Sequence, residues 1–196
     1  MNHADVVLRG YRPQDAASWV RCRALAFLET QYYDDVHPVR TQLSEPSLAL
    51  VAVDGEELVG LLDIEIDGTE ATIDSIATHP DHQGRGIGTR LLQHALPTLT
   101  ARGVHTLDAW TREDAPANRW YVRNGFTERY RYLHVYLSAQ DDAAGFTTPE
   151  GLSTPVGAFM HAAVEDEAAL RQRYRRVYLC RQYLRELTAA DRRTTS

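Results

Sequence analysis

The residues best suited to chemistry lie in one short run, from His79 to Arg90, which reads HPDHQGRGIGTR. Its glycines, Gly84, Gly86 and Gly88, occupy alternate positions, and glycine lets backbone N–H groups approach a ligand closely. The apolar residues that follow from Leu91 have the pattern of a helix. The first turn of a helix exposes unpaired N–H groups and carries a partial positive charge. The run therefore predicts a site for a pyrophosphate.

Three phosphate-binding loops compete for this signal, and spacing separates them. A Walker loop requires Lys followed by Ser or Thr after its last glycine, but the chain contains no lysine. The dinucleotide fingerprint requires Gly-x-Gly-x-x-Gly, which the three glycines do not match. The third pattern, Gln-x-x-Gly-x-Gly, is met by Gln83, Gly86 and Gly88 and follows a strand-like run.

This pattern resembles the acetyl-CoA loop of the GNAT superfamily of N-acyltransferases. The resemblance implies that backbone amides bind the pyrophosphate and that Arg85 and Arg90 neutralise its charge. It also implies that pantetheine pairs with the backbone of the preceding strand, where Thr78 replaces the family's usual small aliphatic residue. The amides belong to Gln83, Gly84, Arg85, Gly86, Ile87, Gly88 and Thr89, and the strand positions are Ile76, Ala77 and Thr78.

A second family signature, Tyr-x-x-x-Gly-Phe, is present at Tyr121, Gly125 and Phe126. By resemblance, Tyr121 is the acid that protonates the leaving CoA thiolate. A phenol has a reference pKa of about 10, so it carries its proton at neutral pH. The family often has Asn seven residues before this Tyr, where the chain has Asp114, and Asn118 is the alternative for that CoA contact.

Attack of an amine on a thioester also requires a base, because the nucleophile must be neutral. The family places this base variably. Asp108, in the strand after the glycine-loop helix, is the first choice. Asp74, Glu29 and Glu65 are the alternatives.

The elements expected around these residues alternate between strands and helices. Their order is β-α-(α)-β-β-β-α-β-α-β, typical of a mixed α/β sheet with early hairpins and late crossovers, and it matches the GNAT order over residues 5 to 138. Strands are expected at 6–11, 48–53, 58–66, 71–78, 104–110 and 130–137, and helices from 13, at 86–102 and at 117–124. Residues 29–46 are expected to form a loop or a broken helix.

Beyond the GNAT domain at 1–138 we expect a linker at 139–163 and a C-terminal helix at 164–190. Acidic residues precede arginines in this last segment, as the helix dipole favours. An apolar stripe from Leu170 to Leu187 must pack on its own domain, on a second copy in a homodimer, or over the substrate cleft. The expected fold is therefore the α/β GNAT fold with a C-terminal helical extension.

Composition excludes several other classes. A net charge of −6 argues against a non-specific nucleic-acid binder. No apolar run approaches the roughly 20 residues of a membrane-spanning helix, and the first residues lack a signal-peptide pattern. Cys22 and Cys180 are far apart, and the histidines have no metal-ligand spacing. We expect a cytoplasmic protein with no metal site.

The sequence thus predicts an N-acetyltransferase that moves acetyl from its co-substrate acetyl-CoA to a primary amine, on a small molecule or a peptide, by direct attack. The alternatives are a non-catalytic acyl-CoA-binding module and a nucleotide-binding protein. No motif identifies the acceptor, although Asp34 and Asp35 favour a cationic one.

Overall fold

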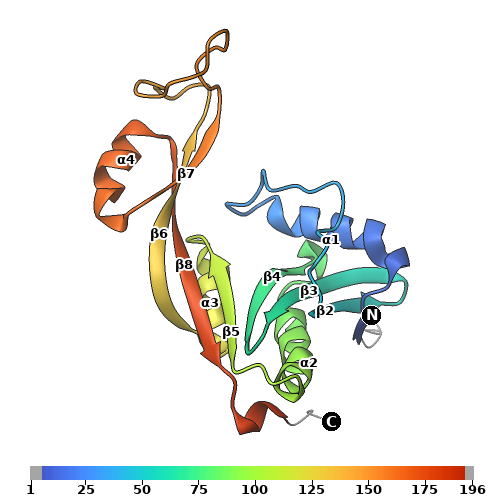
Figure 1. The fold of residues 1–196 in the computed structure, drawn as a ribbon. Coiled ribbons are helices and arrows are strands. Elements are labelled where there is room, and N and C mark those ends of the chain that lie inside the picture. The colour runs from blue at the N-terminus through green and yellow to red at the C-terminus, as the bar shows by residue number, and fades with distance from the viewer. Residues whose placement is uncertain (1–5, 193–196) are drawn as a thin grey trace.

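A computed structural model describes residues 6–192, and within them one eight-stranded sheet runs through the molecule (Figure 1). The strand order is β1-β2-β3-β4-β5-β8-β6-β7. The strands are β1 Val7–Gly10, β2 Ser47–Asp54, β3 Glu57–Asp67, β4 Glu70–Thr78, β5 Thr106–Thr111, β6 Thr127–Leu137, β7 Ala158–Ala162 and β8 Arg176–Glu186. The α-helices are α1 Ala16–Phe27, α2 Ile87–Ala101, α3 Ala115–Arg123 and α4 Glu167–Arg173. This confirms a mixed α/β fold.

The neighbouring strands β4 and β5 are parallel, and they pair over only part of their length. Their register joins Glu70–Ile73 to Thr106–Ala109. Beyond these residues β4 continues to Thr78 and β5 to Thr111 without pairing to each other. The sheet therefore opens between the carboxyl ends of these two strands.

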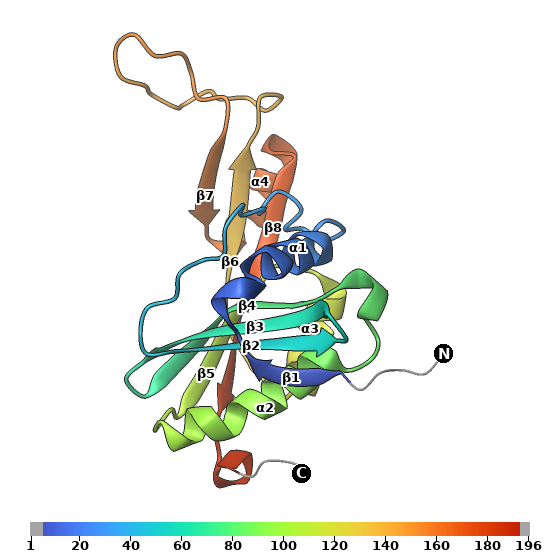
Figure 2. The ribbon, with the colours of Figure 1, turned by 90° about the vertical axis from the view of Figure 1, so that its right-hand side faces the viewer.

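Helices cover both faces of the N-terminal half of the sheet (Figure 2). On one face, Trp19 and Cys22 of α1 pack against Leu61 and Ala77 in a buried cluster. On the other face, apolar residues of α2 and α3 share the largest core cluster with β2 to β5. Gly60 of β3 allows this close packing, because a Cβ at that position would lie 2.6 Å from Ile87 Cγ2. The start of α2, and with it the glycine loop, is thereby held against the sheet.

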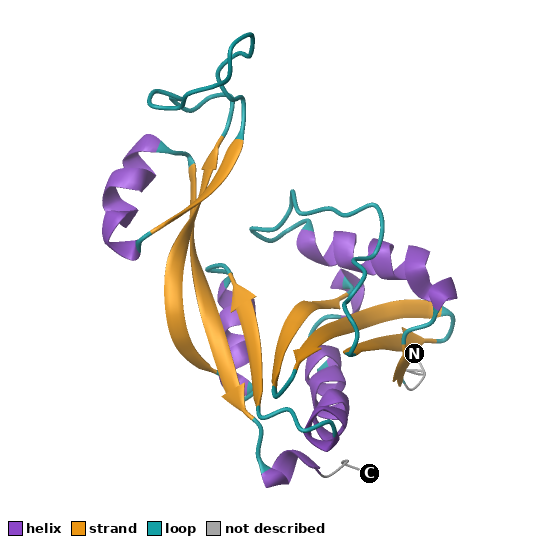
Figure 3. Cartoon of the chain, in the orientation of Figure 1, coloured by secondary structure: helices purple, strands orange, loops and turns teal. Residues whose placement is uncertain are grey.

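The expected C-terminal helix at 164–190 is wrong. A short helix, α4, forms at Glu167–Arg173, and the chain then extends into β8 (Figure 3). β8 lies between β5 and β6 and is antiparallel to both. Its aromatic and β-branched residues favour a strand, and two hydrogen-bonded neighbours outweigh the helical spacing of its apolar residues.

The segment expected as a linker, 139–163, also contributes to the sheet. It is mostly loop, but Ala158–Ala162 form the edge strand β7, paired to β6. The boundary expected at residue 138 therefore falls within a sheet that continues through β7 and β8. No helix among residues 6–192 is both long and apolar enough to cross a membrane.

Candidate functional site

A cleft of about 600 Å³ passes through the opening between β4 and β5. Its two ends are lined by different elements. One end, called here the glycine-loop end, is lined by Gln83, Gly84, Gly86, Ile87, Gly88, Thr89, Trp120, Arg123 and Asn124. The other, the α1 end, is lined by Arg23, Ala26, Phe27, Thr30, Tyr32, Asp35, Asp74, Ser75 and Trp110.

The glycine-loop end is built mainly from backbone. Gly84 and Gly86 have φ of 76° and 72°, and Gly86 is the N-cap of α2. A Cβ at either position would meet no atom within 4 Å, so the space outside the loop is open to a ligand. Within the described chain, no side chain caps α2 and no acidic residue lies in its first turn. The backbone N–H groups in the first turn of α2 are therefore free to bind an anion.

Tyr121 lies on the cleft wall and is 5% exposed. Its ring stacks on Tyr183 with 5.2 Å between centroids and meets Phe126 edge-on at 5.3 Å. Burial raises the pKa of the Tyr121 phenol, and nearby Tyr32 and Asp108 add to the effect. The hydroxyl therefore keeps its proton at neutral pH.

A β-bulge shapes the α1 end. The register between β3 and β4 shifts so that Asp63 opposes Ser75 and Ile64 opposes Ile73, which leaves Asp74 as the extra residue. Ser75 Oγ donates to Asp74 Oδ2 at 3.1 Å and accepts from Arg23 Nε at 3.4 Å. Asp74 is exposed to the cleft, and no ion pair to it forms within residues 6–192.

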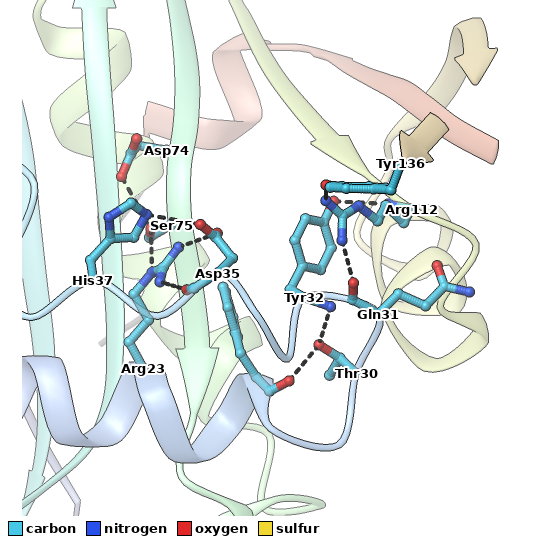
Figure 4. A network of polar contacts seen from close by, with 11 residues as sticks. Arg23, Thr30, Gln31, Tyr32, Asp35, His37, Asp74, Ser75, Arg112 and Tyr136 are labelled. Atoms are coloured by element: carbon cyan, nitrogen blue, oxygen red, sulfur yellow. Dashed lines mark hydrogen bonds and ion pairs between the residues drawn. The ribbon is translucent and has the colours of Figure 1, made fainter. Parts of the chain in front are cut away.

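Arg23 ties α1 to the following loop, residues 28–46 (Figure 4). Its guanidinium donates to the backbone oxygen of Asp35 at 2.7 Å and to Asp35 Oδ2 at 2.8 Å, and His37 Nε2 lies 2.9 Å from the other carboxylate oxygen. Burial alone would raise the pKa of Asp35, but Arg23 and His37 outweigh it and lower that pKa. Asp35 is therefore an internal counter-ion.

Arg112, next to the end of β5, holds the other side of the same loop (Figure 4). Its backbone N–H donates to the Tyr32 hydroxyl at 3.0 Å, and its guanidinium lies 4.1 Å from the Tyr32 ring centroid. The guanidinium also donates to Gln31 O and the Tyr136 hydroxyl. Burial raises the pKa of Tyr32 to about 12. The loop thus bridges the two halves of the sheet over the cleft.

The cleft brings together most of the residues predicted from the sequence, but four do not line it. Asp108 accepts from Gln182 of β8, and Arg85 donates to Asp54 Oδ2 at 2.9 Å. Arg90 donates to Val6 O at 2.8 Å, and the Asn118 amide donates to the backbone oxygens of Arg112 and Asp114. The predicted residues that line it are Ile76, Ala77, Thr78, Gln83, Gly84, Gly86, Ile87, Gly88, Thr89 and Tyr121.

Of the other acidic residues singled out from the sequence, Asp74 lines the cleft, whereas Asp34, Glu29 and Glu65 do not. Asp34 forms an ion pair with Arg176 at 2.8 Å, and Glu65 accepts from Ser44 N at 3.2 Å. Neither Glu29 nor Glu65 lines the cleft.

Comparison with known proteins assigns the family. The model of the "Acetyltransferase (GNAT) family" matches residues 14–126, more than half of the chain and all of the glycine loop. The chain belongs to the GNAT family of acetyltransferases. This match ends at Phe126, so β6, β7 and β8 of this GNAT protein lie outside it.

Two curated relatives show how far sequence similarity extends. A mycothiol acetyltransferase of Clavibacter michiganensis is 29% identical over 140 residues, covering 64% of this chain and 44% of that protein. A ribosomal protein bS18-alanine N-acetyltransferase of Salmonella typhimurium is 37% identical over 95 residues, covering 48% of this chain and 63% of that protein. The matched part of this GNAT protein thus spans less than two thirds of either relative.

Solved structures share the fold. The ribosomal-protein-S18-alanine N-acetyltransferase of Escherichia coli matches with a TM-score of 0.59 at 17% identity, covering 93% of this chain and 94% of that one. PaiA N-acetyltransferase of Thermoplasma acidophilum, solved with coenzyme A, matches with a TM-score of 0.55 at 16% identity over 64% of this chain and 91% of that one. At this identity the likeness is one of fold.

Sequence reasoning missed several side chains of the site in this GNAT protein. Arg123 lines the glycine-loop end, where Arg85 and Arg90 were expected. Arg23 and Tyr32 line the α1 end and hold loop 28–46. No local motif marks these three, and Arg23 and Tyr32 act through Ser75 and Arg112, which lie far away in the chain.

Proposed function

We propose that this protein transfers the acetyl group of acetyl-CoA to a primary amine by direct nucleophilic attack. The observation that carries the proposal is the cleft through the sheet. It has free backbone amides at one end and, at the other, the carboxylate of Asp74, which has no ion-pair partner among residues 6–192, with Tyr121 on its wall. The fold supports the same reaction class, since a structural neighbour was solved with coenzyme A.

The cofactor would enter from the glycine-loop end. Its pyrophosphate would accept hydrogen bonds from the amides of residues 84–89, since the Gln83 N–H already donates to Pro80 O at 3.2 Å. Pantetheine would pair with the edge of β4 at Ile76, Ala77 and Thr78, whose ladder to β3 is complete but which have no partner on β5. Arg123, on the cleft wall, is better placed than Arg85 or Arg90 to meet the phosphates.

The amine would enter from the α1 end and lose a proton before or during its attack. We assign the role of base to Asp74 rather than Asp108, because Asp74 faces the cleft and Asp108 is held by Gln182. The amine nitrogen would attack the thioester carbonyl carbon, and backbone N–H groups of the cleft would stabilise the oxyanion. As the intermediate collapses, the C–S bond breaks and the Tyr121 hydroxyl donates its proton to the CoA thiolate.

The charge at the α1 end supports a cationic acceptor. Asp34 and Asp35 are neutralised by Arg176 and Arg23, so they contribute little negative potential at this end of the cleft. Asp74 has no cation partner within residues 6–192, so an ammonium group of the acceptor would supply one.

The first test is thermal unfolding with acetyl-CoA, CoA and ATP in parallel. Ligand at about 100 times its Kd adds about 2.7 kcal/mol of stability, which raises the Tm by several degrees at about 2–4 °C per kcal/mol. We expect both CoA species, but not ATP, to raise it. No shift with either CoA species would overturn the proposal.

A thiol-release assay against a panel of amines then separates an enzyme from a non-catalytic acyl-CoA-binding module. The panel includes small diamines and peptides with a free N-terminus. We expect amine-dependent release of CoA. Binding of acetyl-CoA without release for any amine would favour the module.

A further inference from the structure

A second group of potential ligands lies outside the cleft, where the turn after β2 meets the segment before the glycine loop. Glu57, His79 and His82 each place one ligand atom within 4.8 Å of the others. His79 directly follows the last residue of β4, and His82 directly precedes Gln83. Both imidazoles are largely buried, with side-chain exposures of 10% and 16%.

The spacing of these atoms is slightly wider than that of ligands around one ion. His82 Nε2 lies 3.5 Å from Glu57 Oε2, and His79 Nε2 lies 3.9 Å from Glu57 Oε1. These contacts are at or beyond the limit of a hydrogen bond. Two atoms that are each about 2.1 Å from a tetrahedral ion lie about 3.4 Å apart, so a small contraction would bring all three side chains onto one ion.

A carboxylate lies near the Nδ1 atom of each of these two histidines. His79 Nδ1 lies 3.8 Å from Asp81 Oδ2, and His82 Nδ1 lies 3.7 Å from Asp54 Oδ2. Metal-bound histidines commonly donate their second N–H to such an acceptor. With Glu57 included, three carboxylates lie near the two imidazoles, and Arg85, paired with Asp54, adds one positive charge, so the local charge favours a cation.

Two donors now occupy the Nδ1 atoms of these histidines, and both would have to release them when an ion binds. Arg85 Nη1 lies 2.7 Å from His82 Nδ1, and arginine can only donate. Asp81 N–H likewise donates weakly to His79 Nδ1 at 3.3 Å. In this state the ring protons therefore lie on Nε2, toward Glu57. Coordination through Nε2 requires the protons on Nδ1, where Asp54 and Asp81 can accept them.

We infer that Glu57, His79 and His82 form a site for one divalent transition-metal ion, with Zn²⁺ the ion best suited to two imidazoles and a carboxylate. The three protein ligands leave a fourth position for water. The ion would hold residues 79–82, which lead directly into the glycine loop. Sequence spacing alone does not mark this site, because Glu57 lies at the start of β3, far from the two histidines in the chain.

Isothermal titration of the full chain with Zn²⁺, and visible absorption with Co²⁺ in its place, test this inference. We expect one ion per chain for the wild type. Glu57→Gln and His82→Gln should each weaken binding by about tenfold or more. His94→Gln, which alters an exposed histidine on α2, is the matched control and should bind as the wild type does.

Arg85→Ala supplies a test in the opposite direction. Its loss removes the competing donor from His82 and one positive charge, so Zn²⁺ should bind more tightly. Far-ultraviolet circular dichroism checks that each variant is folded. Wild-type affinity equal to that of the Glu57→Gln/His82→Gln double variant, or weaker binding by Arg85→Ala, would overturn the site. Neither readout depends on acetyl transfer.

Discussion

The two ends of the cleft are built in different ways. At the glycine-loop end the groups proposed to bind acetyl-CoA are mainly backbone amides, and they come from one short segment, residues 84–89, of which all but Arg85 line the cleft. At the α1 end they are side chains from α1, loop 28–46, β4 and β5, and buried arginines hold them together. A short sequence pattern therefore specifies the glycine-loop end, whereas the α1 end forms only when distant segments come together in the fold.

This difference predicts that changes at one end should affect one co-substrate. Backbone conformation should determine the affinity for acetyl-CoA. Side-chain pairing should determine the affinity for the amine. Tyr121, on the wall between the ends, should affect the chemical step and neither affinity.

The largest effect is expected for Tyr121→Phe. Loss of the general acid should lower kcat by about 10²- to 10⁴-fold, with little change in the KM for acetyl-CoA. Steady-state kinetics with a reactive amine measures it. Tyr174→Phe, which alters a buried tyrosine beneath β6, is the control. An unchanged kcat would remove Tyr121 from the mechanism.

The next largest effect concerns Asp63, which anchors loop 28–46 through Arg40 at 2.8 Å. Burial raises the pKa of Asp63 to about 6, although Arg40 opposes the shift. Folded protein then binds this proton more tightly than unfolded chain does. As pH rises from about 4 to about 6, the loss of this proton therefore lowers the free energy of unfolding.

Asp63→Asn removes this titration. The free energy of unfolding of the variant relative to wild type should rise by up to about 3 kcal/mol between pH of about 4 and about 7. Urea unfolding across this range measures it, with Asp67→Asn at the exposed end of β3 as control. Acetyl-CoA affinity should not change. Parallel pH profiles for wild type and Asp63→Asn would refute the assignment.

Gly86→Ala probes the backbone end. A side chain at φ 72° costs about 1–2 kcal/mol, which lowers the Tm by about 2–8 °C. The added methyl group would also occupy the open space before α2, so acetyl-CoA should bind more weakly while the KM for the amine is retained. Gly151→Ala, at φ 83° in an open loop, carries similar strain away from the cleft. Equal loss of acetyl-CoA affinity in both variants would contradict this view of the loop.

The smallest effect is expected for Asp34→Asn. Its ion pair with Arg176 is partly exposed, and such pairs contribute about 0–1 kcal/mol. The free energy of unfolding should change by less than about 1 kcal/mol. A larger loss, together with a raised KM for the amine, would mean that this pair positions the loop.

Sequence reasoning succeeded where structure is local. The strand, glycine loop and helix from residue 70 to 101 follow from alternation, glycine spacing and an apolar helical face. It failed at β8, because Val177, Tyr178 and Leu184 fit a helical stripe when considered alone. Only insertion between β5 and β6 makes the extended form more stable there.

By itself, the sequence determined the family, the mixed α/β class, the glycine loop in front of a helix and the Tyr121, Gly125 and Phe126 signature. These depend on backbone conformation and neighbouring residues, which a short pattern specifies. Only the tertiary structure decided which arginines and carboxylates face the cleft. Asp74 faces it because of a bulge set by pairing with β3, while Arg85 and Arg90 find partners far away in the chain. Which side chains pair depends on how close they lie in the folded protein, and their separation along the chain does not specify this.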